Sequence, residues 1–416
     1  MDESAGLVQS IWSRELNLPP SCIEFCPAHP SYFLVGTYNL EKDNFEPTND
    51  ERNDDTEASQ IAQPKRTQSR NGSILVFRVD GGEIMHVQTQ VQSSALLDLH
   101  FNPNIGYQDI CATVSSTAIL ALFKLVPDTG EKQPLKHLNT LGISALSEGE
   151  ITPSEGAEIL FLSLCWHPSR ADMLALTTST GHVYLVHLSS MDNGWKLHSE
   201  PVIIHTLEAW TVTLAPNVGF PGLSDEPKAP GEVTFRVFSG GDDSKLRFGT
   251  FNWDATDGQL TETLPAVEFR GHDAGVTAIL PLFVDDNGVE LFITGSYDEN
   301  IRLFSLAPYG RPKNLAEKGL GGGVWRLKLI NLIKDPSGDL VWKATILASC
   351  MHAGARVVEV FQTKVGEFGV SVKGRFEEHK SMNYGSDFVP GGKDKLTIVS
   401  TSFYDRLLCL WELKLP

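Results

Sequence analysis

The segment ELFITGSYDENIRLFSL (290–306) contains two short runs of apolar, β-branched and aromatic residues on either side of the polar sequence SYDEN. Runs of strand length that flank turn-forming residues predict a β-hairpin. The same pattern recurs along the chain. Five further hairpins are predicted at 109–126, 172–188, 233–251, 344–361 and 396–413.

A seventh hairpin can be assembled from 32–38 (YFLVGTY) and 73–79 (SILVFRV) if residues 41–71 are an insertion between its two strands. The insertion is rich in Asp, Glu, Asn and Thr and contains few apolar residues. Such a segment cannot offset the entropy of its own ordering, so we expect a disordered, solvated acidic loop.

One more strand-like run precedes each hairpin, which gives units of an inner strand, a hairpin and a looser fourth strand. The inner strands are predicted at 22–27, 96–103, 160–168, 210–216, 276–283, 324–330 and 384–388. Seven four-stranded units predict an all-β fold in which residues 1–416 form a single seven-bladed WD-repeat β-propeller. The units average about 59 residues, against ~40–45 for an uninterrupted WD repeat. Insertions at 41–71, 127–156 and 217–232 account for the surplus.

The last unit lacks a fourth strand, whereas the run LVQSIWSREL (7–16) at the N-terminus belongs to no unit. We predict that this run closes the ring as the outer strand of the last blade. Closure of this kind leaves neither end of the chain with an unpaired strand edge.

The composition excludes several classes of protein. The chain has 416 residues and a net charge of −18, which argues against a basic nucleic-acid binder. Its 41% hydrophobic residues can form a large core. Six scattered cysteines without a CxxC pair, no signal peptide and no long apolar run predict a soluble cytoplasmic protein without a membrane span.

Histidines and aspartates at repeated positions have a structural interpretation. In WD-type repeats a His before the inner strand bonds an Asp in the hairpin turn, which here predicts a His272–Asp298 hydrogen bond. A catalytic His–Asp dyad is the alternative. Asp243 and Asp405 occupy the same turn position in their units, so the structural interpretation extends to them.

The unit at 344–361 departs from this pattern. When ASCMHAGARVV is aligned with TGSYDENIRLF, His352 takes the place of the structural Asp, and the preceding loop 319–323 offers no His partner. An imidazole without a structural role is suited to general acid or base catalysis. Cys350 lies two residues earlier, either as the nucleophile of a Cys–His pair or as a buried core residue.

Propeller geometry gathers distant residues on one face, because the loops before the inner strands and the turns inside the hairpins share that face. We therefore expect an aromatic, acid-bearing mouth suited to a quaternary ammonium group through cation–π attraction. The alternative is that several rings only cap blade edges. The residues of this predicted mouth are Trp210, Asp243, Tyr297, Trp325, His352, Tyr384 and Tyr404.

Common catalytic motifs are missing from the sequence. It contains no GxSxG, HExxH or Walker loop and no paired Cys/His zinc spacing, so we expect neither a metal nor a cofactor. The glycine-rich GLGGGVW (319–325) leads into a predicted strand rather than a helix, which argues against a phosphate-binding loop.

Several phrases resemble those of one family, the WD-repeat diphthine methylesterases of diphthamide biosynthesis, formerly called diphthine methyltransferase-like proteins. The resemblance rests mainly on EAW (208–210), SGGDD (239–243), TGSYDE (294–299), GGVWRLK (322–328), SCMHAG (349–354), NYGSDF (383–388) and SFYDRLLCLWE (402–412). It implies hydrolysis of the methyl ester on the methylated diphthine intermediate of translation elongation factor 2. That substrate carries a trimethylammonium group, which agrees with an aromatic mouth.

The mechanism expected from these residues uses His352, helped by Asp405 or Tyr404, to activate water or Cys350. Backbone amides of 319–323 would hold the oxyanion. We expect a monomer whose partner is elongation factor 2. Two other functions stay open: a non-catalytic scaffold, which is a frequent role of propellers, and methyl transfer, which the lack of a glycine-rich strand-to-helix loop disfavours.

Overall fold

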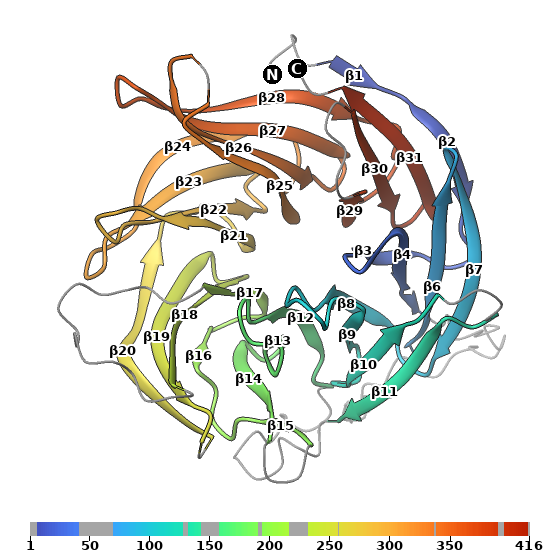
Figure 1. The fold of residues 1–416 in the computed structure, drawn as a ribbon, viewed down its shortest axis with the longest axis horizontal. Coiled ribbons are helices and arrows are strands. Elements are labelled where there is room, and N and C mark those ends of the chain that lie inside the picture. The colour runs from blue at the N-terminus through green and yellow to red at the C-terminus, as the bar shows by residue number, and fades with distance from the viewer. Residues whose placement is uncertain are drawn as a thin grey trace, which may run out of the picture.

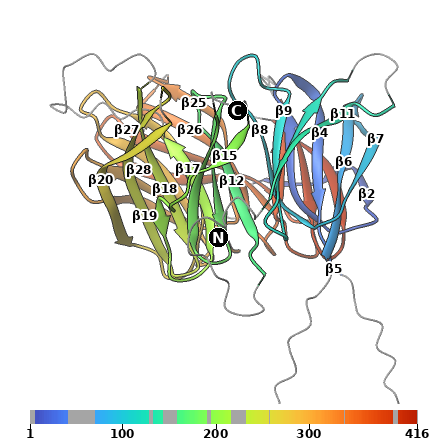
Figure 2. The same ribbon diagram turned by 90° about the horizontal axis from the view of Figure 1, so that it is seen from below.

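The computed structural model describes residues 6–40, 70–127, 132–142, 158–189, 194–215, 232–256, 258–336, 338–389 and 395–414. These residues form β-strands arranged as seven sheets around a central axis (Figure 1). The side view shows the sheets standing along that axis, with their connections at the two rims (Figure 2). No helix long and apolar enough to cross a membrane occurs in the described ranges. The predicted seven-bladed propeller is confirmed.

The first four blades follow the chain in order, from the inner strand outward. Blade 1 contains β3 (Pro20–Cys26), β4 (His29–Thr37), β6 (Arg70–Asp80) and β7 (Glu83–Gln92), with β5 (Asn39–Leu40) beside β6. Blade 2 contains β8 (Leu96–Phe101), β9 (Ile110–Ser115), β10 (Leu120–Leu125) and β11 (Leu135–Leu141). Blade 3 contains β12 (Phe161–Trp166), β13 (Met173–Thr178), β14 (His182–Leu188), β15 (Trp195–Leu197) and β16 (Ile203–Ile204). Blade 4 contains β17 (Ala209–Ala215), β18 (Glu232–Gly241), β19 (Lys245–Asp254) and β20 (Gln259–Arg270).

The last three blades complete the ring and take up both ends of the chain. Blade 5 contains β21 (Val276–Val284), β22 (Glu290–Ser296), β23 (Asn300–Leu306) and β24 (Lys313–Gly319). Blade 6 contains β25 (Arg326–Lys334), β26 (Leu340–Ser349), β27 (Ala355–Thr363) and β28 (Phe368–Phe376), to which β1 (Gly6–Val8) is added. Blade 7 contains β29 (Gly385–Phe388), β30 (Lys395–Ser402), β31 (Leu407–Lys414) and β2 (Ser10–Glu15).

The N-terminal segment closes the ring, as predicted. Strand β2 pairs antiparallel with β31 and supplies the outer strand of blade 7. The preceding strand, β1, pairs in parallel with β28 of blade 6, which the sequence did not predict. The segment therefore joins the two blades that meet beside the chain ends (Figure 1).

All seven predicted inner strands and hairpins are confirmed. The predicted acidic insertion at 41–71 falls almost entirely outside the described residues; at its ends Leu40 is paired opposite Arg70. Part of the predicted insertion at 127–156 is instead β11, the outer strand of blade 2.

The core consists of separate apolar layers, one between each pair of neighbouring blades. Between blades 6 and 7, the rings of Phe376 and Trp411 are stacked 5.0 Å apart. Between blades 7 and 1, Phe33 contacts Phe25 and Phe77, with centroid separations of 4.9 and 5.2 Å. Because both faces of each sheet are covered, the strands are apolar on both sides and can hold their inner edges rigidly around the axis.

Candidate functional site

Buried hydrogen-bond networks fix the turns on one face of the ring. In blade 7, the Trp411 indole donates to Ser400 Oγ (3.0 Å), which lies 2.8 Å from His379 Nε2. The Asp405 carboxylate accepts a hydrogen bond from the Lys380 amide (3.0 Å). Asp405 thereby holds the turn in place, which supports the structural interpretation rather than a catalytic role.

The blade 5 network differs from the prediction. His272 Nε2 lies 2.7 Å from Thr294 Oγ1, and there is no direct His272–Asp298 hydrogen bond. The Asp298 carboxylate instead accepts from the Asp273 amide (2.9 Å) and from Arg302 (2.8 Å). Arg302, on β23, neutralises the charge of Asp298. His272 and Asp298 therefore both have structural roles, but the predicted hydrogen bond between them is wrong.

Asp243 belongs to a similar network in blade 4 and does not line the mouth. Its carboxylate lies 3.0 Å from His205 Nδ1 and 2.6 Å from Arg247, and the side chain is only 4% exposed. The preceding residue, Asp242, accepts a hydrogen bond from the Trp210 indole (3.0 Å). The carboxylate beside the Trp210 ring is therefore that of Asp242, and the prediction of Asp243 at this position is corrected.

These networks predict a pH-dependent stability. Burial lowers the pKa of His272 and His379 to about 4, from about 6.5 in the unfolded chain. Between these values the unfolded state binds protons that the folded state does not, so the free energy of unfolding falls as pH falls. We expect urea unfolding to show a loss of about 2 kcal/mol or more between pH 7 and pH 5. A His379→Asn variant should show a smaller loss; equal stability of the native protein at both pH values would contradict the prediction.

The predicted aromatic mouth is a continuous array of rings. Trp325 is its centre, with ring centroids 5.6 Å from Trp210, 5.9 Å from Tyr297 and 5.1 Å from Tyr384. Beyond Tyr384 the array continues through Phe403, 5.5 Å away. Phe403 in turn contacts Tyr404 (5.0 Å) and Tyr38 (6.1 Å).

The array follows the opening over five consecutive blades. Its rings come from blades 4, 5, 6 and 7, with Tyr38 following β4 of blade 1. Tyr404 is 71% exposed, whereas the rings between Trp210 and Phe403 are half-buried. Because neighbouring centroids are in direct packing contact, a cation would lie against the outward faces of the rings rather than between them.

Ion pairs span the central channel beneath this array. Arg326 of blade 6 reaches Asp98 of blade 2, with 3.4 Å between nitrogen and oxygen. Lys328, also of blade 6, lies 3.1 Å from Glu24 of blade 1 and 2.8 Å from Asp387 of blade 7. We call these residues, together with His100, the charged floor. Every one of them is on an inner strand, so the propeller axis brings together charges from four blades.

The protonation of the charged floor follows from its geometry. Burial lowers the pKa of His100, but Glu24 (2.8 Å away) and Asp98 outweigh it and raise the pKa to about 10. His100 is therefore a cation at neutral pH. Burial also raises the pKa of Asp98, but Arg326 and His100 hold it well below its usual range. Cations and anions thus alternate across the channel.

Cys350 does not have the properties of a nucleophile. Its side chain is fully buried in the apolar layer between blades 5 and 6, and burial raises the pKa of the thiol to about 12. Nucleophilic attack needs an accessible thiolate. The interpretation as a core residue is the better one, and the predicted Cys–His pair is not supported.

His352 is exposed at the tip of the turn between β26 and β27. The preceding residue, Met351, forms a bridge with Asn383, next to Tyr384 of the mouth. The Gly322 and Gly323 backbone is buried behind this turn, against the Cys350 carbonyl and the Met351 sulfur. This packing leaves His352 beside the mouth but does not favour amides of 319–323 as an oxyanion hole.

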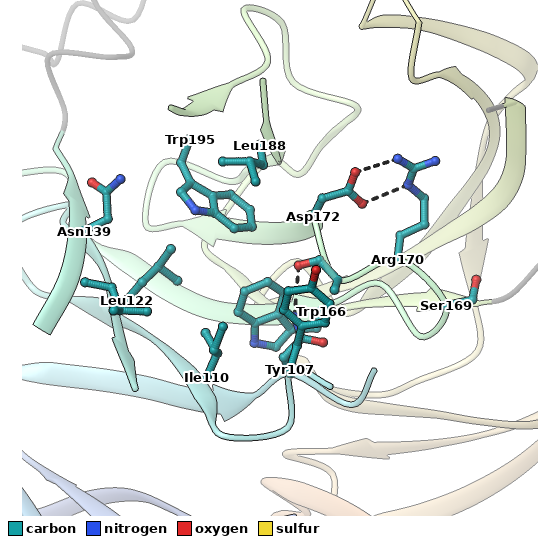
Figure 3. A pocket seen from close by; sticks show the side chains of 13 residues that line it. Tyr107, Ile110, Leu122, Asn139, Trp166, Ser169, Arg170, Asp172, Leu188 and Trp195 are labelled. Carbon is teal, nitrogen blue, oxygen red and sulfur yellow. Dashed lines mark hydrogen bonds and ion pairs between the residues drawn. The ribbon is translucent and has the colours of Figure 1, made fainter. Parts of the chain in front are cut away.

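A cavity of about 590 Å³ lies between blades 2 and 3, away from the mouth (Figure 3). Trp166 and Trp195 form one wall, with centroids 5.7 Å apart, and the Arg170–Asp172 ion pair lies at its edge. Arg170 and Asp172 belong to the β12–β13 connection, at the opposite end of the inner strands from the mouth. No group of His, Cys, Asp and Glu side chains able to hold a metal ion occurs in the described part of the chain.

Comparison with known proteins identifies relatives over most of the chain, although no family model matches it. A protein of Dictyostelium discoideum named diphthine methyltransferase homolog is 26% identical, covering 96% of this chain and 98% of the relative. The diphthine methyltransferase of Saccharomyces cerevisiae is 26% identical, covering 95% of each. That of Schizosaccharomyces pombe is 28% identical, covering 83% of this chain and 87% of the relative. The chain is therefore similar to these diphthine methyltransferases over most of its length.

The phrases that carried the family resemblance fall on the site. EAW contains Trp210, TGSYDE contains Tyr297, and NYGSDF contains both Tyr384 and Asp387. GGVWRLK contains Trp325 and Arg326 together with Lys328. The mouth therefore comes largely from the segments that resemble the family, and so do Arg326, Lys328 and Asp387 of the charged floor; Glu24, Asp98 and His100 lie outside these segments.

Proposed function

We propose that this chain is an enzyme of diphthamide biosynthesis that hydrolyses the methyl ester of methylated diphthine on translation elongation factor 2. The names of its relatives support an enzyme of this pathway rather than a non-catalytic scaffold. The observation that carries the substrate assignment is the aromatic array around Trp325, beside the Asp242 carboxylate. Aromatic faces and a nearby anion attract a trimethylammonium group.

Ester hydrolysis agrees better with the structure than methyl transfer, despite the name that the relatives carry. Methyl donors are commonly held by a glycine-rich loop between a strand and a helix. The described residues form only strands and turns, and Gly322 and Gly323 are packed behind the turn that contains Met351. Hydrolysis needs only water, a base and a group that stabilises the oxyanion.

We assign the proposed base to His352, because it is the exposed imidazole beside the mouth. In this mechanism it takes a proton from the attacking water. Tyr404 contributes its exposed ring to the mouth, whereas Asp405 acts only by holding the turn. We further propose that the chain acts as a cytoplasmic monomer, and that its net charge of −18 favours docking to a basic surface of the elongation factor.

The assignment of His352 is tested with two variants. His352→Ala should lower kcat by about 100-fold, the usual range for loss of a general base, and leave the melting temperature unchanged. Cys350→Ala should keep most of the activity, because the thiol is buried. Activity is measured as methanol released from elongation factor 2 that carries the methyl-esterified intermediate. Full turnover by His352→Ala, or complete loss in a folded Cys350→Ala variant, would refute these roles.

A further inference from the structure

Arg326 lies where the aromatic array meets the charged floor. Its guanidinium carbon is 5.0 Å from the centroid of the Trp325 ring, at the centre of the array. The same side chain borders a small cavity of about 40 Å³ that also touches Tyr384, Lys328 and His100. One cation is therefore shared between the surface proposed to bind an ammonium group and a small cavity that is also bordered by charged-floor residues.

The guanidinium is only loosely held by its protein partners. It lies 3.4 Å from Asp98, and it donates to the carbonyl oxygens of Trp325 (3.2 Å) and Thr277 (3.5 Å). Hydrogen bonds of arginine to anions are usually ~2.7–2.9 Å long. A guanidinium has five N–H donors, so Arg326 can donate to an additional, closer oxygen without losing these contacts.

Asp98, in contrast to Arg326, is firmly held by its protein partners. Its carboxylate accepts hydrogen bonds from Ser163 Oγ (2.8 Å) and from the backbone amides of Leu164 and Leu99 (3.2 and 3.1 Å), and it is 2% exposed. A buried anion so firmly bonded is a fixed point that attracts the guanidinium of Arg326. Asp98 is thus a positioning residue for Arg326.

The chemistry of the proposed substrate matches this arrangement. A single carbon separates the quaternary nitrogen of methylated diphthine from the ester carbonyl carbon. If the ammonium group of the substrate lies on the aromatic array, its carbonyl group lies within a few ångströms of the same rings. This distance is comparable with the separation between the Trp325 ring and the Arg326 guanidinium. We propose that Arg326 binds the ester carbonyl oxygen and stabilises the oxyanion, an inference that rests on the proposed function.

The reaction step balances without any further reactant. The oxygen of water bonds to the carbonyl carbon while the proposed base removes a proton, and the carbonyl electron pair moves onto the oxygen held by Arg326. When this electron pair re-forms the carbonyl double bond, the bond from carbon to the methoxy oxygen breaks, and the methoxy group takes the proton from the base. Methanol leaves, and the new carboxylic acid loses its proton to solvent. The resulting carboxylate is again a ligand for Arg326.

Binding of small probes tests this inference without turnover. Trimethylglycine carries a quaternary nitrogen one carbon from a carboxylate, whereas tetramethylammonium has the cation alone. By calorimetry, the native protein should bind trimethylglycine at least ~10-fold more tightly, because of a charge-assisted hydrogen bond. Arg326→Gln should bind both probes equally, and so should Asp98→Asn/Arg326→Gln, which avoids an unpaired buried anion. Arg311→Gln, at an exposed position in the β23–β24 connection, is the control and should keep the preference.

Turnover separates this inference from the proposed function. With esterified elongation factor 2, Arg326→Gln and the double variant should lose about 100-fold in kcat, with little change in KM. If the native protein is active and both variants match it, the role of Arg326 is refuted while the esterase stands. If the native protein releases no methanol, the proposed function fails and the carbonyl assignment fails with it. Probe binding without preference for trimethylglycine also overturns the inference.

Discussion

Deletion of residues 1–17 is expected to lower the melting temperature by more than 10 °C or to abolish folding. The deletion removes β2, which covers the edge of β31, and β1, which covers the edge of β28. It also removes Leu16, which is 5% exposed in the layer between blades 7 and 1. Full burial of one leucine stabilises by ~1.5–3 kcal/mol, and the total stability of a domain is typically ~5–15 kcal/mol.

A shorter deletion provides the control. Removing residues 1–5 leaves both N-terminal strands in place and should not change the melting temperature. Both proteins can be compared with the native chain by differential scanning fluorimetry. An unchanged melting temperature after removal of 1–17 would show that the ring does not depend on the N-terminal strands.

Substitution of Trp325 by Ala is expected to reduce kcat/KM by at least about 30-fold, mainly through KM. Each cation–π contact contributes ~0.5–2 kcal/mol, and Trp325 also supports Trp210, Tyr297 and Tyr384. Because the ammonium group does not change during ester hydrolysis, the loss should affect substrate and transition state alike. Trp325→Phe should recover much of the activity.

The matched control is Trp195→Ala, which removes a half-buried tryptophan from the cavity between blades 2 and 3 (Figure 3). It should leave KM unchanged. Tetramethylammonium binding gives an independent readout, since Trp325→Ala should weaken it whereas Arg326→Gln should not. Equal KM values for native protein and Trp325→Ala would contradict the placement of the ammonium group.

The fold was largely predictable because each blade repeats one local pattern. Hairpins such as 290–306 carry strand-length apolar runs and a polar turn, and seven of them can bury both faces only in a closed ring. The parallel pairing of β1 with β28 was not predictable, since GLV (6–8) is too short to show a periodicity.

The aromatic half of the site was predicted from the positions of Trp210, Tyr297, Trp325 and Tyr384 in the repeats. The charged floor was missed, because its residues are one or two charges within largely apolar segments, as in CIEFC (22–26) and LLDLHF (96–101). Their pairing depends on the distance across the channel, which no local pattern reveals. A signal was nevertheless present: a charged residue inside a predicted inner strand must face the axis, where a counter-charge has to meet it.

The most direct test of the proposed function is incubation of the purified chain with elongation factor 2 that bears the methyl-esterified intermediate. The modified peptide is followed by mass spectrometry, and the released methanol is quantified. The proposal predicts a peptide lighter by one methylene group, with one methanol released per peptide and the trimethylammonium group retained. An unchanged peptide, or one that gains a methyl group in the presence of a methyl donor, would contradict it.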